Sequence, residues 1–420
     1  MSEVTYPSDQ VRAAARATYA VFIGAGFAFA SWASRIPQVK NHLGLTPAHL
    51  GLVLLAIAVG SVIALPLSGL IVHRLTTRWT ITVMSLVNAV GLLVVAVGYV
   101  SGVVPVMIGL FLFGFSNGAW DVAMNVQGAD VEQHLGKSIM PRYHAGYSIG
   151  TVAGALLGAV MVALGVPVTA HLIGVAVVIA VAMPLWVRRF LPDAHTTAEN
   201  HPQSNRRPSV FARWREPRTL LVGLVVLAFA FSEGTGNDWI SLAAIDGYHV
   251  PAAVGALCLA VFLTAMTVGR WVGPGLLDRF GRVAVVRTLA FVAFIGLILF
   301  VFGAIVPLAF LGALLWGAGT SLGFPVGMSA AADEPAAAAG RVSVVASIGY
   351  CAFLGGPPVI GFLGSHGGVR HALTAVAVAL AVATVLAAAM RPLKPASQVG
   401  PDAAPEAIPT DAFPRSPDRA

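Results

Sequence analysis

Long apolar runs alternate with short polar segments along almost the whole chain. Most of the runs reach about 20 residues, the length at which an α-helix crosses the hydrocarbon core of a bilayer. We therefore expect an all-α integral membrane protein. The pattern predicts twelve spanning helices, at 17–34, 50–72, 80–100, 103–126, 143–165, 168–187, 219–243, 251–276, 283–304, 306–331, 342–364 and 368–390.

The composition supports this prediction. Hydrophobic residues make up 57% of the chain and charged residues only 10%, whereas soluble domains carry about 25% charged residues. A chain this apolar could not cover its surface in water. Cys258 and Cys351 both fall in apolar runs, so we expect no disulfide between them.

The first apolar run follows Arg12 and Arg16, which is also how a signal peptide begins. A cleavable signal has a shorter apolar region and a small-residue cleavage site, which Ala28-Phe29-Ala30 resembles only faintly. The repeat described below needs this run as the partner of the run at 219–243. We therefore favour a retained spanning helix.

The charged loops predict the orientation. The connections at 1–16, 73–79, 127–142, 188–218, 277–282, 332–341 and 391–420 hold nearly all the Lys and Arg that lie outside the spans. The opposite connections hold only Arg35, Lys40 and Arg370. Because positive loops stay in the cytoplasm, both termini should be cytoplasmic. The net charge of +7 then reflects this bias at the inner leaflet, and we expect no nucleic-acid partner.

The longest internal polar stretch divides the chain near its midpoint. The domains that we expect are a cytoplasmic N-terminus at 1–16, a six-helix half at 17–187, a cytoplasmic linker at 188–218, a second six-helix half at 219–390 and a disordered tail at 391–420.

The two halves repeat each other weakly. Gly69–Arg74 after the second run has a counterpart in Gly275–Arg279 after the eighth, Ser148-Ile149-Gly150 matches Ser347-Ile348-Gly349, and Trp32 matches Trp239. All these offsets are near 200 residues. Internal repeats of this kind mark transporter folds.

One loop carries a more specific resemblance. Asp278-Arg279-Phe280-Gly281-Arg282 is similar to the Asp-Arg-x-Gly-Arg loop of the major facilitator superfamily, and Glu334 with Arg341 resembles its Glu-x6-Arg pair. The resemblance implies twelve helices in two pseudo-symmetric halves, and a cytoplasmic charge network that latches one conformation.

The first-half copy of the loop is degraded. His73 stands in the place of the Asp and Thr76 in the place of the Gly, while Glu132 is followed by Arg142 rather than by an Arg seven residues on. A first-half latch is therefore in doubt. The residues that we assign to gating are Arg74, Arg142, Arg270, Asp278, Arg279, Arg282, Glu334 and Arg341.

A narrower resemblance concerns the solute. Segments 31–37, 118–125, 140–144 and 232–239 look like those of a bacterial group near the fucose permeases. This implies uptake or export of a small polar organic solute, such as a sugar, coupled to protons, in a bacterial inner membrane. We also expect that the protein works as a monomer and without a cofactor.

Carboxylates inside spans are costly, by about 2.5–3.5 kcal/mol on insertion scales, and are therefore functional candidates. Asp121 shares a helical face with Asn117 and Asn125. Solute or proton handling by Asp121 and a structural pair with Arg74 or Arg142 remain open alternatives. Glu233 is the better placed proton carrier, while Asp238 lies nearer the outer surface. Both could face one cavity only if the intervening glycines distort the helix.

Other polar and aromatic side chains complete the predicted solute site. His144, Tyr147 and Ser148 form a polar helical face, which suits either a cavity lining or helix packing. Trp32, Trp120 and Trp239 could stack on a sugar ring, although Trp32 and Trp239 could instead anchor their helices at the interface. Arg35 either contributes to the site or snorkels to the outer face. Arg270 could pair with Asp278 or with a carboxylate of the other half.

Two rival functions are less favoured. A drug efflux antiporter should have a greasy cavity and a Gly-Pro motif in the fifth span, which lacks the proline. A membrane-embedded enzyme or receptor is the other rival, but no nucleophile–base pair, metal-ligand cluster or ATP-binding motif is visible. We expect neither an enzyme nor a metal site.

The charge pattern makes a prediction about topology. Reporter fusions at residue 205 and at the C-terminus should both report the cytoplasm, and a fusion at residue 102 should report the outside, because Lys and Arg retain their loops on the inner side. Measured reporter activity in cells checks this. An external signal at residue 205 would reverse the proposed orientation.

Overall fold

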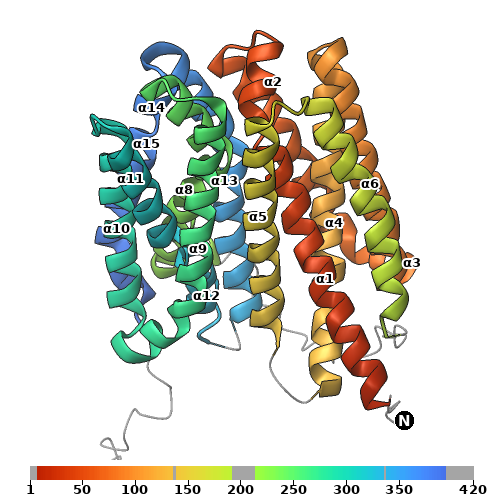
Figure 1. The fold of residues 1–420 in the computed structure, drawn as a ribbon. Coiled ribbons are helices and arrows are strands. Elements are labelled where there is room, and N and C mark those ends of the chain that lie inside the picture. The colour runs from red at the N-terminus through yellow and green to blue at the C-terminus, as the bar shows by residue number, and fades with distance from the viewer. Residues whose placement is uncertain (1–6, 136–138, 192–212, 335–336, 394–420) are drawn as a thin grey trace, which may run out of the picture.

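The structure is a computed structural model that describes residues 7–135, 139–191, 213–334 and 337–393. Within these ranges the chain forms a bundle of long, roughly parallel and antiparallel helices (Figure 1). Most of the predicted linker and nearly all of the predicted tail lie outside the described residues, so their predicted conformations stay predictions. The all-α membrane fold class is confirmed.

The first half contains six spans. Its helices are α1 (Ser8–Ala33), the short α2 (Ile36–His42), α3 (Pro47–Ser101), α4 (Val103–Leu135), α5 (Met140–Ala163) and α6 (Val168–Trp186), followed by the 3₁₀ turn η1 (Val187–Arg189). Helix α3 has 55 residues, and at 1.5 Å per residue it is more than twice as long as a bilayer core is thick. It therefore contains two spans that turn back at Thr76, where the helical backbone is interrupted.

The second half repeats this arrangement. Its helices are α8 (Pro217–Tyr248), α9 (Ala252–Phe280), α10 (Arg282–Phe302), α11 (Val306–Thr320) with α12 (Gly323–Ala331), α13 (Ala338–Gly367), and finally α14 (Val369–Ala372), α15 (Thr374–Leu386) and η2 (Ala387–Met390). Eleven helical segments are long and apolar enough to span a membrane, and one of them is the double span α3. The described chain thus has the twelve predicted spans.

Two turns at equivalent places in the halves share an unusual backbone conformation. Gly281, in the Asp278–Arg282 loop, has φ 76° and ψ 160°, and Thr76 has φ 71° and ψ 162°. This region suits glycine, because a Cβ atom is crowded there, and it costs other residues about 1–3 kcal/mol. The first-half turn therefore keeps the geometry of the loop after losing the glycine that accommodates it. Thr77, which donates a hydrogen bond of 2.9 Å from Oγ1 to Gln127 Oε1, ties the turn to α4.

The two ends of the bundle differ in their contents. Val11 on α1, Val131 on α4 and Leu191 pack together at one end, and at the same end of the second half Arg218 on α8 donates to the backbone oxygen of Arg391 after η2. We call this the linker end and the opposite one the α2 end. In Figure 1 the linker end is at the bottom and α2 is at the top.

Glycines permit close helix contact within each half. A Cβ atom on Gly150 of α5 would lie 2.1 Å from the backbone oxygen of Ile23 on α1, and one on Gly349 of α13 would lie 2.9 Å from Val226 on α8. The predicted repeat thus pairs α1–α5 with α8–α13. Small residues of this kind let helix backbones approach closely where lipid provides no hydrophobic drive.

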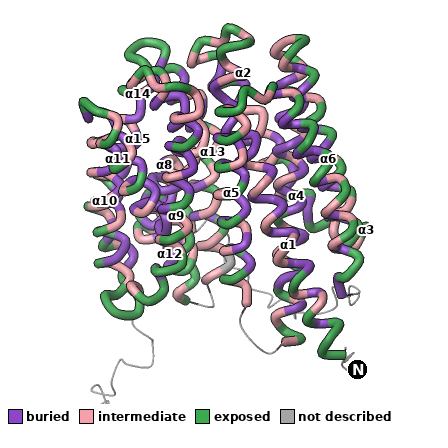
Figure 2. Tube along the Cα trace, in the orientation of Figure 1, coloured by how far each residue is buried: buried purple, intermediate pink, exposed green. Residues whose placement is uncertain are grey.

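The halves meet along two helix pairs, α3 with α13 and α5 with α9. Near the α2 end, a Cβ atom on Gly51 of α3 would lie 2.4 Å from the backbone oxygen of Pro357 on α13. A Cβ atom on Gly361 would likewise lie 2.5 Å from the backbone oxygen of Pro47. Buried residues fill the interior of each half, and exposed apolar residues cover the outside of the bundle (Figure 2), as expected for a surface in lipid.

The shared turn conformation predicts that exchanging threonine and glycine changes the free energy of unfolding in opposite directions at the two turns. Thr76→Gly should raise the free energy of unfolding by about 1 kcal/mol, because relief of about 1–3 kcal/mol of strain exceeds the roughly 0.5–1 kcal/mol entropic cost of a glycine. Gly281→Thr should lower it by a similar amount. Thermal unfolding of the purified protein in detergent measures both. Gly275→Ala is the control: no atom lies within 4 Å of its new Cβ, and within helix α9 alanine is favoured over glycine, so this variant should not lose stability. A Gly281→Thr variant as stable as the parent would contradict the shared geometry.

Candidate functional site

An ion pair inside the second half anchors the candidate site. Arg270 Nη2 on α9 lies 2.8 Å from Glu233 Oε1 on α8, and both side chains are largely buried. Arg270 Nε also donates to the backbone oxygen of Ser321, between α11 and α12. Arg270 pairs with neither of the partners that we expected, which were Asp278 and a carboxylate of the other half. Pairing lowers the cost of placing both charges inside the membrane.

Asp121 on α4 has no cation partner in the described part of the chain. Asn125, one turn further, donates to both the backbone oxygen and Oδ1 of Asp121, at 2.8 and 3.3 Å. Asp121 is exposed although it lies within a spanning helix. Neither Arg74 nor Arg142 forms an ion pair with it in this structure, and Asn117 instead accepts a hydrogen bond of 3.2 Å from Asn88.

Helix α5 connects these groups. Tyr147 lies within electrostatic reach of Asp121, Glu233 and Arg270, and His144 lies within reach of Arg270. On α13, Tyr350 lies within reach of Asp121. Since α4 and α5 belong to the first half and α8, α9 and α13 to the second, the structure gathers polar side chains of both halves at the centre. Tyr350 was not among the predicted site residues, because a tyrosine in an apolar run gives no signal of its own.

The other predicted carboxylate stands apart. Asp238 is partly buried on α8 and forms no hydrogen bond or ion pair with described residues. Helix α8 is continuous from Pro217 to Tyr248, without the distortion at its glycines that a shared cavity face requires. Glu233 therefore reaches Arg270, while Asp238 points in another direction around the helix.

The predicted aromatic residues are packed into the core. The rings of Trp32, Trp120 and Trp239 are at most 1% exposed, so none is available for stacking on a solute in this conformation. Ser148 is also buried, and its Oγ donates to the backbone oxygen of His144.

Arg35 is buried rather than extended to the surface. It is 2% exposed, and its Nε donates to Nδ1 of His171 on α6 at 2.9 Å. His171 was missed from the sequence, since a lone histidine near a helix start has many ordinary explanations.

A network of charges lies at the linker end of the second half. Arg341 on α13 bonds Glu334 at 2.8 Å, which joins the predicted Glu-x6-Arg pair, and it also bonds Glu216 at 2.7 Å. Arg282 and Arg218 both bond Asp333, at 2.8 and 2.7 Å. Glu216, Arg218 and Asp333 were not predicted, because only the family motif had marked this region.

Glu216 is held in its charged form. Burial acts to raise its pKa, but hydrogen bonds from Arg341, Arg213 and Thr219 outweigh burial and lower the pKa to about 2. Because the pKa is depressed on folding, this contribution to stability is present above the ordinary pKa of 4.5 and is lost as the pH falls toward 2. The network is therefore intact at physiological pH.

The remaining predicted gating residues are exposed. Asp278 and Arg279 both lie at the surface of the linker end; Arg279 stacks on the ring of Phe280, and Asp278 has no partner among described residues. Arg74 and Arg142 are exposed as well. Every ion pair that joins different helices at this end connects residues of the second half alone, within the described chain.

The halves touch at the opposite end. Lys40 Nζ, in α2, lies 3.4 Å from Asp246 Oδ2, at the end of α8, and this ion pair spans the two halves. Together with the contact of Gly51 against Pro357, it joins the halves at the α2 end.

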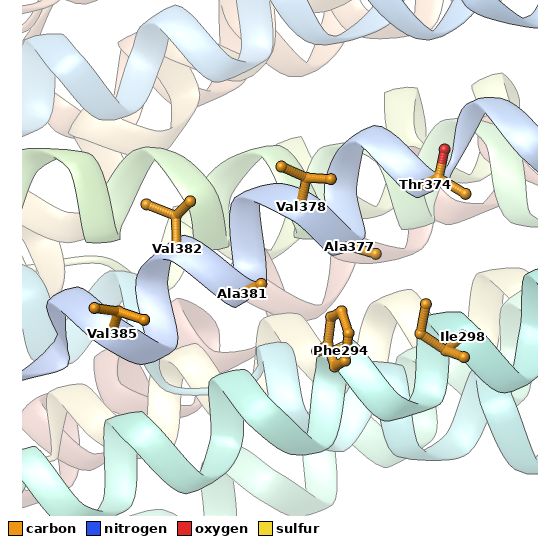
Figure 3. A pocket seen from close by; sticks show the side chains of 8 residues that line it. All are labelled: Phe294, Ile298, Thr374, Ala377, Val378, Ala381, Val382 and Val385. Atoms are coloured by element: carbon orange, nitrogen blue, oxygen red, sulfur yellow. The ribbon is translucent and has the colours of Figure 1, made fainter.

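A separate groove lies on the outside of the bundle and is no solute site. It is formed by α10 and α15, has a volume of about 400 Å³, and contains no charged residue (Figure 3). The side chains that line it are Phe294, Ile298, Thr374, Ala377, Val378, Ala381, Val382 and Val385.

Twelve spans in two pseudo-symmetric halves, with polar groups of both halves gathered between them, define a membrane transporter rather than an enzyme. Residues 18–355 match the Major Facilitator Superfamily, and the chain belongs to that family. The family assignment drawn from the Asp278–Arg282 loop is confirmed.

Relatives and solved structures agree with this assignment. The uncharacterized transporter y4wD of Sinorhizobium fredii is 31% identical over 379 residues, which cover 90% of this chain and 98% of that protein. Membrane protein MosC of Rhizobium meliloti is 27% identical over 364 residues, 86% of each chain. Among solved structures, the nucleoside transporter NupG has 16% identity and a TM-score of 0.70, with 90% of this chain and 98% of that chain covered. A variant of the E. coli fucose:proton symporter FucP has 16% identity and a TM-score of 0.56, with 89% and 98% covered.

Proposed function

We propose that the protein moves a small polar organic solute across the bacterial inner membrane by alternating access, and that protons drive the movement. The observation that carries this proposal is the juxtaposition of Asp121 with the Glu233–Arg270 pair, one from each half, around Tyr147. These side chains lie where the two halves meet. When the halves move, the side chains can therefore change their protonation and their solute contacts in the same step.

The two carboxylates have different roles in this proposal. Glu233 balances Arg270, so protonation of Glu233 releases the arginine, which then has a free donor for the solute. Among the described residues, Asp121 has only Asn125 as a side-chain hydrogen-bond partner, and Asp121 is exposed, so it can accept a proton, or a hydrogen bond from a solute hydroxyl, directly. Asn117, Asn125, His144 and Tyr147 supply further polar contacts.

The conformational cycle follows from the asymmetry of the two ends. The linker end faces the cytoplasm in our proposal, with both termini there, and the α2 end, where Lys40 and Asp246 join the halves, faces outward. In this conformation Asp278 has no partner among the described residues and Arg279 stacks on Phe280; both engage the first half when the cytoplasmic side closes. Arg282, Glu334 and Arg341 hold the linker end of the second half rigid throughout. We propose that one chain performs the cycle as a monomer.

We infer the solute class from the chemistry of the central side chains and from the solutes of similar solved structures. The central side chains are amides, hydroxyls and charged groups, which suit hydroxylated molecules rather than apolar drugs. NupG is a nucleoside transporter and FucP a fucose:proton symporter. Nucleosides and hexoses such as L-fucose are therefore the first probes, with radiolabelled uptake into proteoliposomes as the assay.

Substitution of the carboxylates tests proton coupling. Glu233→Gln should reduce the solute accumulation driven by a pH gradient at least about tenfold. It should retain exchange of solute, because the amide keeps the shape of the carboxylate but cannot titrate. Asp121→Asn should behave like Glu233→Gln if Asp121 carries a proton. It should lose both accumulation and exchange if Asp121 binds the solute. Uptake in vesicles with and without an imposed pH gradient measures this.

Asp9→Asn is the matched control, because this carboxylate is exposed at the linker end and pairs with Arg12 rather than with a central residue. It should transport as the parent does. If both central variants accumulate solute uphill as well as the parent, then neither residue couples protons, and the proposal fails.

A further inference from the structure

A second groove lies at the linker end of the second half, outside the transport site. It opens between the start of α8 and the end of η2, and it is lined by Arg218, Leu221, Ala388, Ala389, Arg391, Pro392 and Leu393. Its floor is apolar and two arginines stand at its rim. The groove between α10 and α15 has no charged lining residue, whereas the linker-end groove combines apolar and charged surface.

The two arginines of this groove differ in whether other residues hold their side chains. Arg218 is held by Asp333 at 2.7 Å and by the backbone oxygens of Ala330 and Arg391 at 3.3 and 3.0 Å. The side chain of Arg391 is exposed and has no hydrogen bond or ion pair among the described residues. Since Asp333 already shares its charge between Arg218 and Arg282, the surroundings of Arg391 carry a net positive charge.

The groove sits at the boundary of the membrane. Arg391 follows the last residue of the final spanning segment, Val369–Met390, and Arg218 is the second residue of the span Pro217–Tyr248. The exposed indole of Trp214 marks the same level, where tryptophans are enriched at headgroups. Leu221 and Leu393 are 36% and 41% exposed, so the apolar floor continues onto the surface that faces lipid.

We propose that this groove binds an anionic phospholipid, with the headgroup phosphate on Arg391 and an acyl chain along Leu221 and Ala388. A phosphate matches the free guanidinium, and basic pockets between spanning helices are a known setting for anionic headgroups. The apolar floor requires a ligand with a chain. Through Arg218 and Asp333, the lipid would contact the same network that fixes α10 at the linker end. This inference does not depend on the solute or on proton coupling.

Native mass spectrometry of the purified full-length protein tests the proposal. The probes are phosphatidylglycerol and phosphatidylcholine with identical acyl chains, and glycerol 3-phosphate as the headgroup without chains. Phosphatidylglycerol should bind more tightly than phosphatidylcholine, and glycerol 3-phosphate should not displace it. Arg391→Gln should weaken the tightest phosphatidylglycerol site about fivefold, the effect of one surface arginine.

The chain provides a matched control. Arg188→Gln removes an exposed arginine at the equivalent end of α6 in the first half, and it should leave the tightest site unchanged. Ala388→Phe keeps every charge but fills the floor of the groove, and it should weaken binding as well.

Several results would overturn the proposal. One is equal binding of the two lipids, and another is equal loss in Arg391→Gln and Arg188→Gln, which would indicate attraction to overall charge. Displacement by glycerol 3-phosphate would assign the site to a free phosphate. An unchanged lipid affinity in Ala388→Phe would show that no acyl chain lies in the groove.

Discussion

The ion pair between Glu233 and Arg270 is the interaction on which the centre of the bundle depends. An isolated charge inside a bilayer is expensive, and each of these side chains lowers the cost of the other. The pair also fixes the relative rotation of α8 and α9, and Arg270 reaches on to the junction of α11 and α12. Asp121, from the other half, has no cation partner among the described residues and shares the neighbourhood of Tyr147 with this pair. The chemistry that we propose follows from this imbalance.

The same principle governs the ends of the molecule. At the linker end, Arg218, Arg282 and Arg341 are each balanced by nearby acids, and these ion pairs tie α8, α10 and α13 to one another. At the α2 end, the Lys40–Asp246 ion pair and the close approaches of Gly51 and Gly361 are among the contacts that join the halves. These contacts must break for this end to open during a cycle. The exposed Asp278 is available for the opposite state.

The sequence predicted the spans, the halves and the family, because apolar length and the Asp278–Arg282 loop are local features. It did not reveal that α1 begins at Ser8 or that α4 continues to Leu135, since helices extend past the apolar part that hydropathy detects. Partners such as Glu233–Arg270, Arg35–His171 and Arg341–Glu216 depend on helix rotation. No local pattern encodes that rotation, so the candidate residues were found more readily than their contacts.

Distances between the halves at each end test alternating access most directly. Spin labels at positions 69 and 275, which are glycines with no atom within 4 Å of a new Cβ, report on the linker end, and labels at the exposed Asn41 and His249 report on the α2 end. Cys258 and Cys351 are replaced first. Double electron–electron resonance should show one distance shortening as the other lengthens when the pH changes or a transported solute is added. Distances that remain constant, or that change together, would contradict the account.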